Sequence, residues 1–450
     1  MVEGHPLLSF FTDPILRGPT IGCMLMCFAA SLVGVIVFLR KQMLVGETLS
    51  HASYPGVVLG ILLAGFFLIE ETNEGKLALF ILAGALTTSL IGLAFIHFLE
   101  KRMKVPNDAA LCFVLSTFFG LGLMLTSEVQ FSHTSLYKQV LTYLYGQAAT
   151  MSDVHIAIYG VLSLVVLFIV VLFYKEIEVL TFDRTFAKSL GIPVRTIDAM
   201  LFMLVTLAVI IGIRSVGVVL MSAMLIAPAV AARQFTNRLS IMFILSAFFG
   251  MASGFFGNYF SVQLTHYFSV NFPSARIILP TGPMIVITAS LICMTALLLS
   301  FERGLAVRVG RIAFFRYQCV CENLLKTIWR LDKAVSLSEL AKFQASSSFY
   351  LKFLLWRMRS NGLVSITGEG SYVLTQQGKF KAEKIVRLHR LWEVYLVNYL
   401  GARTERVHHN AEEMEHILTP ELETELTLLL NDPKRDPHHQ LIPPRGKYVL

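Results

Sequence analysis

The chain has 450 residues, of which 55% are hydrophobic and only 15% are charged. This balance excludes an intrinsically disordered protein, a collagen-like fibre and a wholly soluble enzyme. The charges are unevenly distributed, because the last 134 residues carry 33 of the 68 charged side chains. The sequence therefore predicts a membrane part followed by a water-soluble part.

The first 302 residues contain the apolar segments. A membrane-spanning helix needs about 20 mostly apolar residues. Nine segments meet this requirement: 20–39, 51–69, 77–99, 109–125, 153–173, 197–213, 216–234, 239–260 and 283–301. The shorter, mixed segment 133–149 is expected to be interfacial or re-entrant. We expect an all-α polytopic membrane domain with about nine transmembrane helices over residues 1–302.

The short loops between these segments differ in charge. Taken alternately, one set of loops carries 15 Lys and Arg residues and the other set carries 5. Loops rich in basic residues stay in the cytoplasm. The sequence therefore predicts an N-terminus outside the cell and a C-terminal part in the cytoplasm.

The segment 45–56 places ionisable residues at the edge of an apolar stretch. Glu47 and His51 are one helical turn apart and share a face, so together they could hold a passing divalent cation. Pro55-Gly56 follows directly and is expected to break the helix and free backbone carbonyls. The alternative is that Glu47 lies at the membrane surface and that His51 hydrogen-bonds to a neighbouring helix.

The loop 174–196 contains a short amphipathic helix. Ala187 and Leu190 share its apolar face, charged residues occupy the other face, and Gly191 ends it. Such a helix is suited to docking a partner protein. The alternative is a helix that lies on the lipid surface.

These features, in this order, resemble the metal-ion ABC transporter permease family, which imports zinc, manganese or iron. Further motifs that carry the resemblance, over roughly residues 10–302, are Leu39-Arg40-Lys41, Asp108-Ala109-Ala110, Tyr143-Leu144-Tyr145-Gly146, Val216-Gly217-Val218 and Pro280-Thr281-Gly282-Pro283. The resemblance implies a bacterial inner-membrane permease that pairs with a second permease, and an external metal-binding protein that delivers the ion. It implies a transport pathway through Glu47 and His51, where Glu47 replaces the usual Asp. It also implies a separate ATPase docked at Asp183, Ala187 and Gly191.

The chain contains no G-x-x-x-x-G-K-[ST] phosphate loop. It is therefore not expected to be an enzyme, and ATP hydrolysis is assigned to the separate subunit.

The soluble part begins after a basic linker, 303–320, that anionic lipid would attract. Helices are predicted from Glu322 to Leu331, from a capping box at Ser336 and Glu339, and over 348–360, followed by a strand, a turn and a strand. Three helices and a hairpin predict a winged helix-turn-helix over 321–380. Its candidate DNA-contacting residues are Ser347, Ser348, Tyr350 and Lys352. Winged helices also serve as protein-interaction modules.

Residues 381–450 contain the strongest metal-binding pattern. His389 and Glu393 are four residues apart, and His408, Glu412, Glu415 and His416 share one helical face. Imidazole and carboxylate ligands suit divalent first-row metals. The alternative is a charged helix face in contact with solvent.

This part resembles the diphtheria toxin repressor family of iron- or manganese-dependent repressors. The motifs are Arg357-Met358, Gly362-Leu363-Val364, His389-Arg390-Leu391 with Glu393, Val407-His408, Ala411-Glu412, Glu415-His416 and Pro437-His438. The resemblance implies a metal-activated dimer that binds operator DNA, with the six residues above as ligands and Fe(II) or Mn(II) favoured over Zn(II). Two positions depart from the family. Asn323 stands where relatives place a ligand, and Phe349, Tyr350 and Phe353 stand where relatives present small or polar residues.

The sequence as a whole predicts an importer joined to the repressor that senses its cargo. Because a tethered repressor must still reach DNA, we expect proteolytic release in the 303–320 linker. The alternative is that the C-terminal domain is a cytoplasmic metal-sensing gate that inhibits transport without binding DNA.

Overall fold

The computed structural model describes residues 7–67, 74–132, 134–273, 277–301, 304–343, 347–368, 370–402, 407, 411, 412, 414, 416 and 419–445. The chain divides into two units, Met1–Val307 and Arg308–Leu450, each with its own internal contacts. They are described separately below.

The described residues of the first unit form only helices. These are α1 (Ser9–Thr12), α2 (Pro14–Leu39), α3 (Met43–Phe67), α4 (Glu74–Arg102), α5 (Asn107–Ser132), α6 (Thr134–Tyr145), the 3₁₀ turn η1 (Ala148–Thr150), α7 (Asp153–Leu172), α8 (Tyr174–Phe182), α9 (Arg184–Ser189), α10 (Val194–Val216), α11 (Met221–Phe235), α12 (Leu239–Asn271) and α13 (Thr281–Leu299). Over the described ranges, 8 helices are long and apolar enough to cross a membrane. The chain is an integral membrane protein.

The seventh of the nine expected spans, 216–234, is not a full span. Gly217 has a φ of 91°, which ends α10, and the next helix, α11, begins only at Met221 and has 15 residues. A helix of that length is about 22 Å long, less than the roughly 30 Å of a bilayer core. The segment 133–149 contains α6, whose 12 residues are likewise too few for a span.

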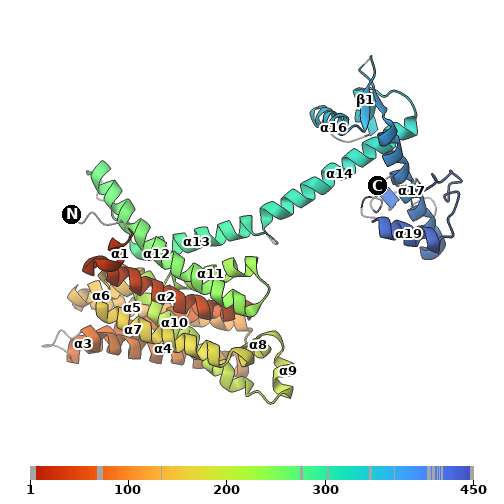
Figure 1. Cartoon of the computed structure of the whole chain (residues 1–450). Helices are drawn as coiled ribbons and strands as arrows, with labels where there is room; N and C mark the ends of the chain where they lie inside the picture. The colour runs from red at the N-terminus through yellow and green to blue at the C-terminus, as the bar shows by residue number, and fades with distance from the viewer. Residues whose placement is uncertain are drawn as a thin grey trace. The chain divides into compact units, whose positions relative to one another are not determined.

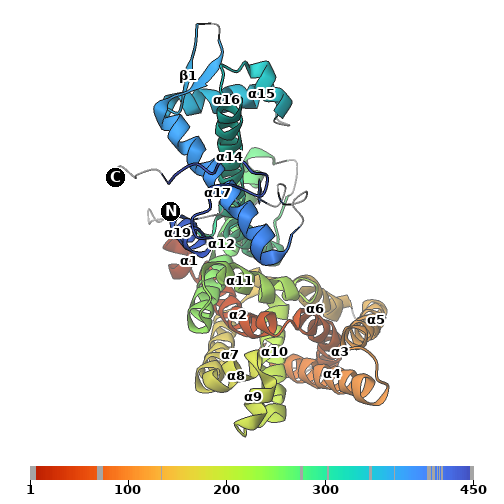
Figure 2. The ribbon, with the colours of Figure 1, turned by 90° about the vertical axis from the view of Figure 1, so that its right-hand side faces the viewer.

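The centre of the first unit is formed by α2 and α3. In each of them 72% of the most apolar stretch is buried, against 28% in α4, α5 and α7. α2 packs against α7, α11 and α12, whereas α3 packs against α4 and α5 (Figures 1 and 2). At the α3–α4 contact a Cβ on Gly56 would lie 2.0 Å from the carbonyl oxygen of Gly84, so only glycine permits this approach.

The second unit contains the helices α14 (Leu305–Leu331), α15 (Leu337–Phe343), α16 (Ser348–Ser360), α17 (Gln376–Leu400) and α19 (Pro420–Leu429), and the strands β1 (Val364–Ile366) and β2 (Tyr372–Leu374). The strands pair antiparallel with Val364 opposite Leu374. Figure 2 shows this hairpin projecting beside α16.

The local signals in 336–362 predicted these elements correctly. Ser336 and Glu339 form the expected capping box, in which Glu339 N donates to Ser336 Oγ at 3.3 Å and Ser336 N donates to Glu339 Oε2 at 3.2 Å. Ser347 caps α16 by accepting from Tyr350 N. The predicted buried face of α16 is confirmed, because Leu351, Leu354, Leu355 and Met358 are all buried.

The segment 305–320 forms the first half of α14 and continues without a break into the helix that was expected to begin at Glu322. Its residues from Arg308 to Arg316 are exposed. The residues that anchor α14 in the core of the second unit come later, at Leu324, Leu325 and Ile328.

Candidate metal sites

His51 is a buried residue of α3. Its side chain is 7% exposed, and its ring meets Phe119 of α5 edge-on with ring centroids 4.5 Å apart. Its Nδ1 atom is buried and has no hydrogen-bond partner in the described part of the chain. Glu47 lies one turn earlier on α3 and is half-buried. The two residues are therefore on one helix, and the imidazole retains a nitrogen that can bind a ligand.

The helix around His51 is unusually polar for a membrane interior. Thr48, Ser50 and Ser53 are fully buried, and Ser50 Oγ donates to the carbonyl of Val218 at 2.8 Å. Contrary to expectation, α3 is not broken at Pro55-Gly56 but continues to Phe67. Pro55 has no N–H to donate to the carbonyl of His51, four residues earlier, so an acceptor is still released at that position.

The expected docking helix is α9. Asp183 is its N-cap and accepts from the backbone N–H groups of Thr185 and Phe186 at 2.8 and 2.9 Å. Ala187 is fully buried, and Gly191 has a φ of 76° that lets the chain turn after the helix.

Two exposed residues of this segment, Phe182 and Phe186, were not singled out from the sequence. Phe182, Phe186 and Leu190 recur at helical spacing and are 65%, 53% and 55% exposed. Leu190 therefore does not share the buried face of Ala187. Arg184 and Arg40 both pair with Asp198, which fixes the segment to α2 and α10.

In the second unit His389 and Glu393 lie together on α17. They are 4% and 2% exposed, and His389 Nε2 lies 3.1 Å from Glu393 Oε1. The other ring nitrogen, Nδ1, lies 3.3 Å from the ammonium of Lys326 on α14. Lys326 Nζ also lies 3.8 Å from Glu412 Oε1. Both nitrogens of His389 are thus engaged, and a metal ion could bind this histidine only by replacing one contact.

His416 contacts a different residue of α14. Its Nδ1 lies 2.6 Å from Glu322 Oε2 of α14, and both side chains are nearly buried. Burial of Glu322 opposes its ionisation, but hydrogen bonds from His416 and Gln318 hold its pKa below the ordinary value. The two other predicted ligands, His408 and Glu415, lie outside the described residues.

Sequence reasoning missed both α14 residues that reach the predicted ligands. It considered Asn323 at this place, whereas the structure brings Glu322 and Lys326 to the cluster. Their spacing of one helical turn was a signal that could have indicated a shared face.

The donor chemistry of this cluster fits a divalent first-row metal, because it consists of imidazole and carboxylate groups in a buried setting. Where positions are described, however, no three His, Cys, Asp or Glu side chains gather closely enough to hold an ion. His389 and Glu393 also line a cavity of about 770 Å³ together with Arg390, Asp436 and His438.

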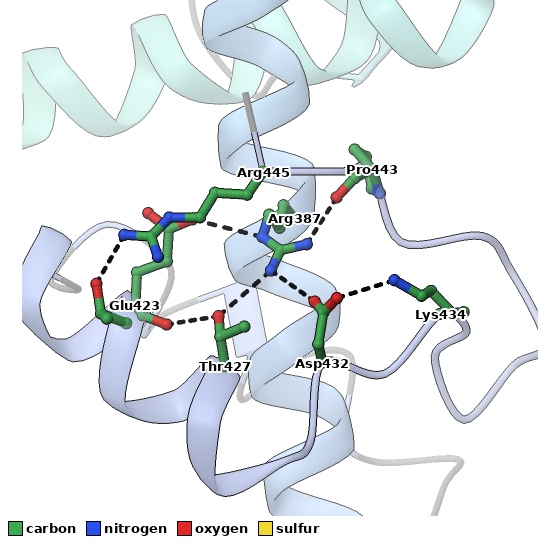
Figure 3. Close-up of polar contacts among 8 residues, drawn as sticks. Arg387, Glu423, Thr427, Asp432, Lys434, Pro443 and Arg445 are labelled. Carbon is green, nitrogen blue, oxygen red and sulfur yellow. Dashed lines mark hydrogen bonds and ion pairs between the residues drawn. The ribbon is translucent and has the colours of Figure 1, made fainter. Parts of the chain in front are cut away.

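A buried arginine fixes the chain beyond the cluster to α17. Arg387 is 3% exposed and donates to the carbonyl of Pro443 at 2.9 Å and to Thr427 Oγ1 at 3.3 Å (Figure 3). It forms ion pairs with Glu423 at 3.5 Å and Asp432 at 3.2 Å. Helix α19 and residues 430–443 are therefore held against the helix that carries His389.

The candidate DNA-contacting residues lie at the start of α16. Ser348 and Lys352 are exposed, Tyr350 is half-buried, and the hydroxyl of Ser347 is used as the helix cap. The exposed surface of α16 is otherwise dominated by aromatic side chains and arginines.

A bundle of apolar helices with a polar buried centre is the architecture of a membrane transport protein, and a unit with buried His and carboxylate groups follows it. Residues 12–300 match the ABC 3 transport family, and residues 375–444 match the domain described as iron dependent repressor, metal binding and dimerisation domain. The chain belongs to the ABC 3 transport family and carries a repressor-like domain at its C-terminal end.

Three similar proteins illustrate this relationship. A probable metal transport system membrane protein of Chlamydia trachomatis is 38% identical over 98% of this chain and 99% of its own length. The manganese transport system membrane protein MntC of Bacillus subtilis is 32% identical over 84% of this chain and 83% of its own length. The structure of PsaBC from Streptococcus pneumoniae in complex with Fab has a TM-score of 0.54 and 25% identity, covering 66% of this chain and 96% of that one.

Proposed function

We propose that the chain is the inner-membrane permease subunit of an ATP-binding-cassette importer for a divalent metal, and that its C-terminal part is a metal-dependent DNA-binding repressor. The single observation that carries this proposal is the match of one polypeptide to both the permease family and the repressor domain. Mn(II) is the first candidate cargo, because a relative that aligns with 84% of this chain is named a manganese transport protein. Fe(II) and Zn(II) are the alternatives.

The transport pathway passes Glu47 and His51. The unpartnered Nδ1 of His51 supports this assignment, because a buried polar atom without a partner is costly unless it has a ligand. The test is uptake of radioactive Mn(II) into cells that make the His51→Ala chain, which should lose uptake. His97→Ala is the matched control, because His97 is an exposed histidine in a spanning helix. Equal uptake by the two variants would refute the pathway.

The permease requires partners. The family supports a separate ATPase, an external metal-binding protein and a second permease subunit, the last also suggested by the PsaBC pair. The ATPase docks on the segment from Asp183 to Gly191, where exposed Phe186 and Leu190 offer an apolar contact. The distribution of basic residues among the loops supports an N-terminus outside and a C-terminal unit in the cytoplasm.

The proposed domains are a permease at 1–302, a linker at 303–320, a winged helix-turn-helix at 321–380, and a metal-binding and dimerisation domain at 381–450. The assignment of residues 321–380 to a winged helix-turn-helix is supported by helices α14, α15 and α16 and the β1–β2 hairpin. Ser347, Ser348, Tyr350 and Lys352 are the proposed DNA contacts. The proposed metal ligands are His389, Glu393, His408, Glu412, Glu415 and His416.

Feedback is the proposed logic: cytoplasmic metal loads the repressor, which then shuts off uptake genes. Release by proteolysis would free it from the membrane. Cleavage within 308–316 needs only local unwinding, because this half of α14 is exposed and contains Gly310. A single full-length band on immunoblots of metal-replete and metal-starved cells would refute release.

The DNA-binding proposal is tested by gel retardation with the second unit, residues 308–450, and DNA upstream of its own transcription unit. We expect retardation that requires Mn(II) or Fe(II) and is lost in Glu412→Ala with His416→Ala. Normal metal binding without retardation would favour the second candidate, a metal-sensing gate that inhibits transport directly. The exposed aromatic face of α16 is the observation that favours that candidate.

A further inference from the structure

The outer face of α16 exposes three large aromatic side chains. Phe349, Phe353 and Trp356 are 85%, 48% and 60% exposed, and the rings of Phe353 and Trp356 are 6.2 Å apart. The helix itself is firmly seated, because its opposite face is buried in the core of the unit. The aromatic face is therefore a fixed surface feature and not the result of a loosely packed helix.

Basic residues flank this aromatic stripe on both sides. Helical residues advance by about 100° each, which places the three rings in one row, with Lys352 and Arg359 along one side and Arg357 along the other. Helix α16 contains no acidic residue. The surface therefore combines a continuous apolar row with positive charge only.

This combination fits a lipid surface better than a DNA groove. Contacts to DNA bases and phosphates use hydrogen-bonding and charged groups, and three rings at the centre of the face offer almost none. A helix with aromatic residues on one stripe and Lys and Arg beside it is typical of segments that lie in the headgroup region of a membrane. An exposed apolar patch of this kind marks an interaction site.

We propose that the outer face of α16 docks on anionic lipid headgroups of the membrane in which the same chain is embedded. The basic residues pair with the lipid phosphates, and the rings enter the boundary between headgroups and acyl chains. The last spanning helix, which ends at Leu299, and α16, which begins at Ser348, belong to one chain, so the docking is intramolecular.

Docking on lipid would cover α16, the helix that carries the proposed DNA contacts, and would prevent it from binding DNA. This effect on DNA binding rests on the proposed function, whereas the docking itself does not. A domain released from the membrane part would lose the advantage of attachment, so the same face would become available in solution.

The chain offers a direct probe, because it contains only three tryptophans, Trp329, Trp356 and Trp392, all in the second unit. In the full-length chain, Trp329→Phe with Trp392→Phe leaves Trp356 as the sole tryptophan. This chain is reconstituted into phosphatidylcholine vesicles that contain brominated phosphatidylglycerol, and the emission is compared with that in unbrominated lipid. We expect bromine to quench Trp356, and the quenching to weaken as salt is raised.

Two variants test the two components of the face without touching the core. Phe349→Ser with Phe353→Ser removes apolar contact, and Lys352→Gln with Arg359→Gln removes charge. Each basic residue near an anionic surface strengthens binding by about fivefold, so the second variant should weaken docking by about 25-fold. The matched control is a chain whose sole tryptophan is Trp392. This residue is half-buried in α17, so bromine should not quench it.

Three results would overturn the proposal. One is equal quenching of Trp356 and Trp392. Another is equal quenching when the brominated lipid is phosphatidylcholine and no anionic lipid is present. The third is the absence of quenching of Trp356. Blue-shifted emission would then indicate that protein covers the α16 face, and red-shifted emission would indicate that the face is exposed to solvent. The measurement contains neither DNA nor added metal, so failure of the repressor proposal would leave its result unchanged.

Discussion

Lys326 provides the sharpest test of the proposed C-terminal metal site. Its ammonium lies 3.3 Å from His389 Nδ1 and 3.8 Å from Glu412 Oε1, between two proposed ligands. A divalent ion bonded to either residue would lie within about 6 Å of that ammonium, where the two charges repel by about 5 kcal/mol or more at an effective dielectric constant of 20. The lysine must therefore move before the ion can bind.

The cost of that movement sets the size of the effect. Lys326 would give up a hydrogen bond from a charged donor, worth about 1.5–3 kcal/mol, and an ion pair with half-exposed Glu412, worth about 0–1 kcal/mol. Replacing it by methionine keeps the apolar stem and removes this cost in advance. We expect Lys326→Met to bind Mn(II) more tightly by about 2–3 kcal/mol, or roughly 30–150-fold.

The second unit, residues 308–450, is titrated with Mn(II). The concentration of free ion is measured at each step from its electron paramagnetic resonance signal. Lys342→Met is the control, because Lys342 is an exposed lysine of the same unit. Unchanged or weaker binding by Lys326→Met would refute the reasoning, since it would mean that the ammonium does not compete with the ion.

Three further predictions concern the architecture. Arg387→Met should destabilise the second unit by about 3–5 kcal/mol in urea unfolding, because it removes the ion pair that Arg387 forms with buried Glu423, and adding Glu423→Leu should recover part of the loss; equal stability of the single and double variants would contradict this. Asp183→Ala should destabilise α9 by about 1 kcal/mol, because it removes the N-cap, and should reduce copurification of the ATPase. Unchanged copurification would argue against docking of the ATPase on α9. Gly84→Leu should prevent recovery of a monodisperse protein, because its Cβ would lie 2.2 Å from the facing glycine carbonyl, whereas Gly120→Leu, with open space around it, should not.

Local features of the fold were predictable because they depend on neighbouring residues. The capping box at Ser336, the buried face of α16 and the eight apolar helices all follow from spacing along the chain. The segment 216–234 was wrongly expected to span, because hydropathy does not register that Gly217 adopts a positive φ and ends the helix. The linker was likewise not recognised as helix, since its arginines and glycines obscure the pattern that α14 follows.

The arrangement of the metal residues could be predicted only in part. The pairing of His389 with Glu393 follows from their positions on one helix. The contact of His416 with Glu322 joins residues 94 positions apart, and no periodicity within either helix indicates it. The same limit applies to Lys326, since a basic residue on an amphipathic helix normally faces solvent and here faces inward.

The glycine contact between α3 and α4 has a mechanical consequence. Gly56 and Gly84 approach each other through their backbones, with the short Thr88 side chain beside them, so little side-chain volume at this contact could repack as the helices slide or turn. A rotation of α3 by itself would drive neighbouring Cβ atoms into the opposite backbone. If the proposed path at His51 opens toward one side of the membrane, we expect α3 and α4 to move as one rigid body, with the hinges outside this pair.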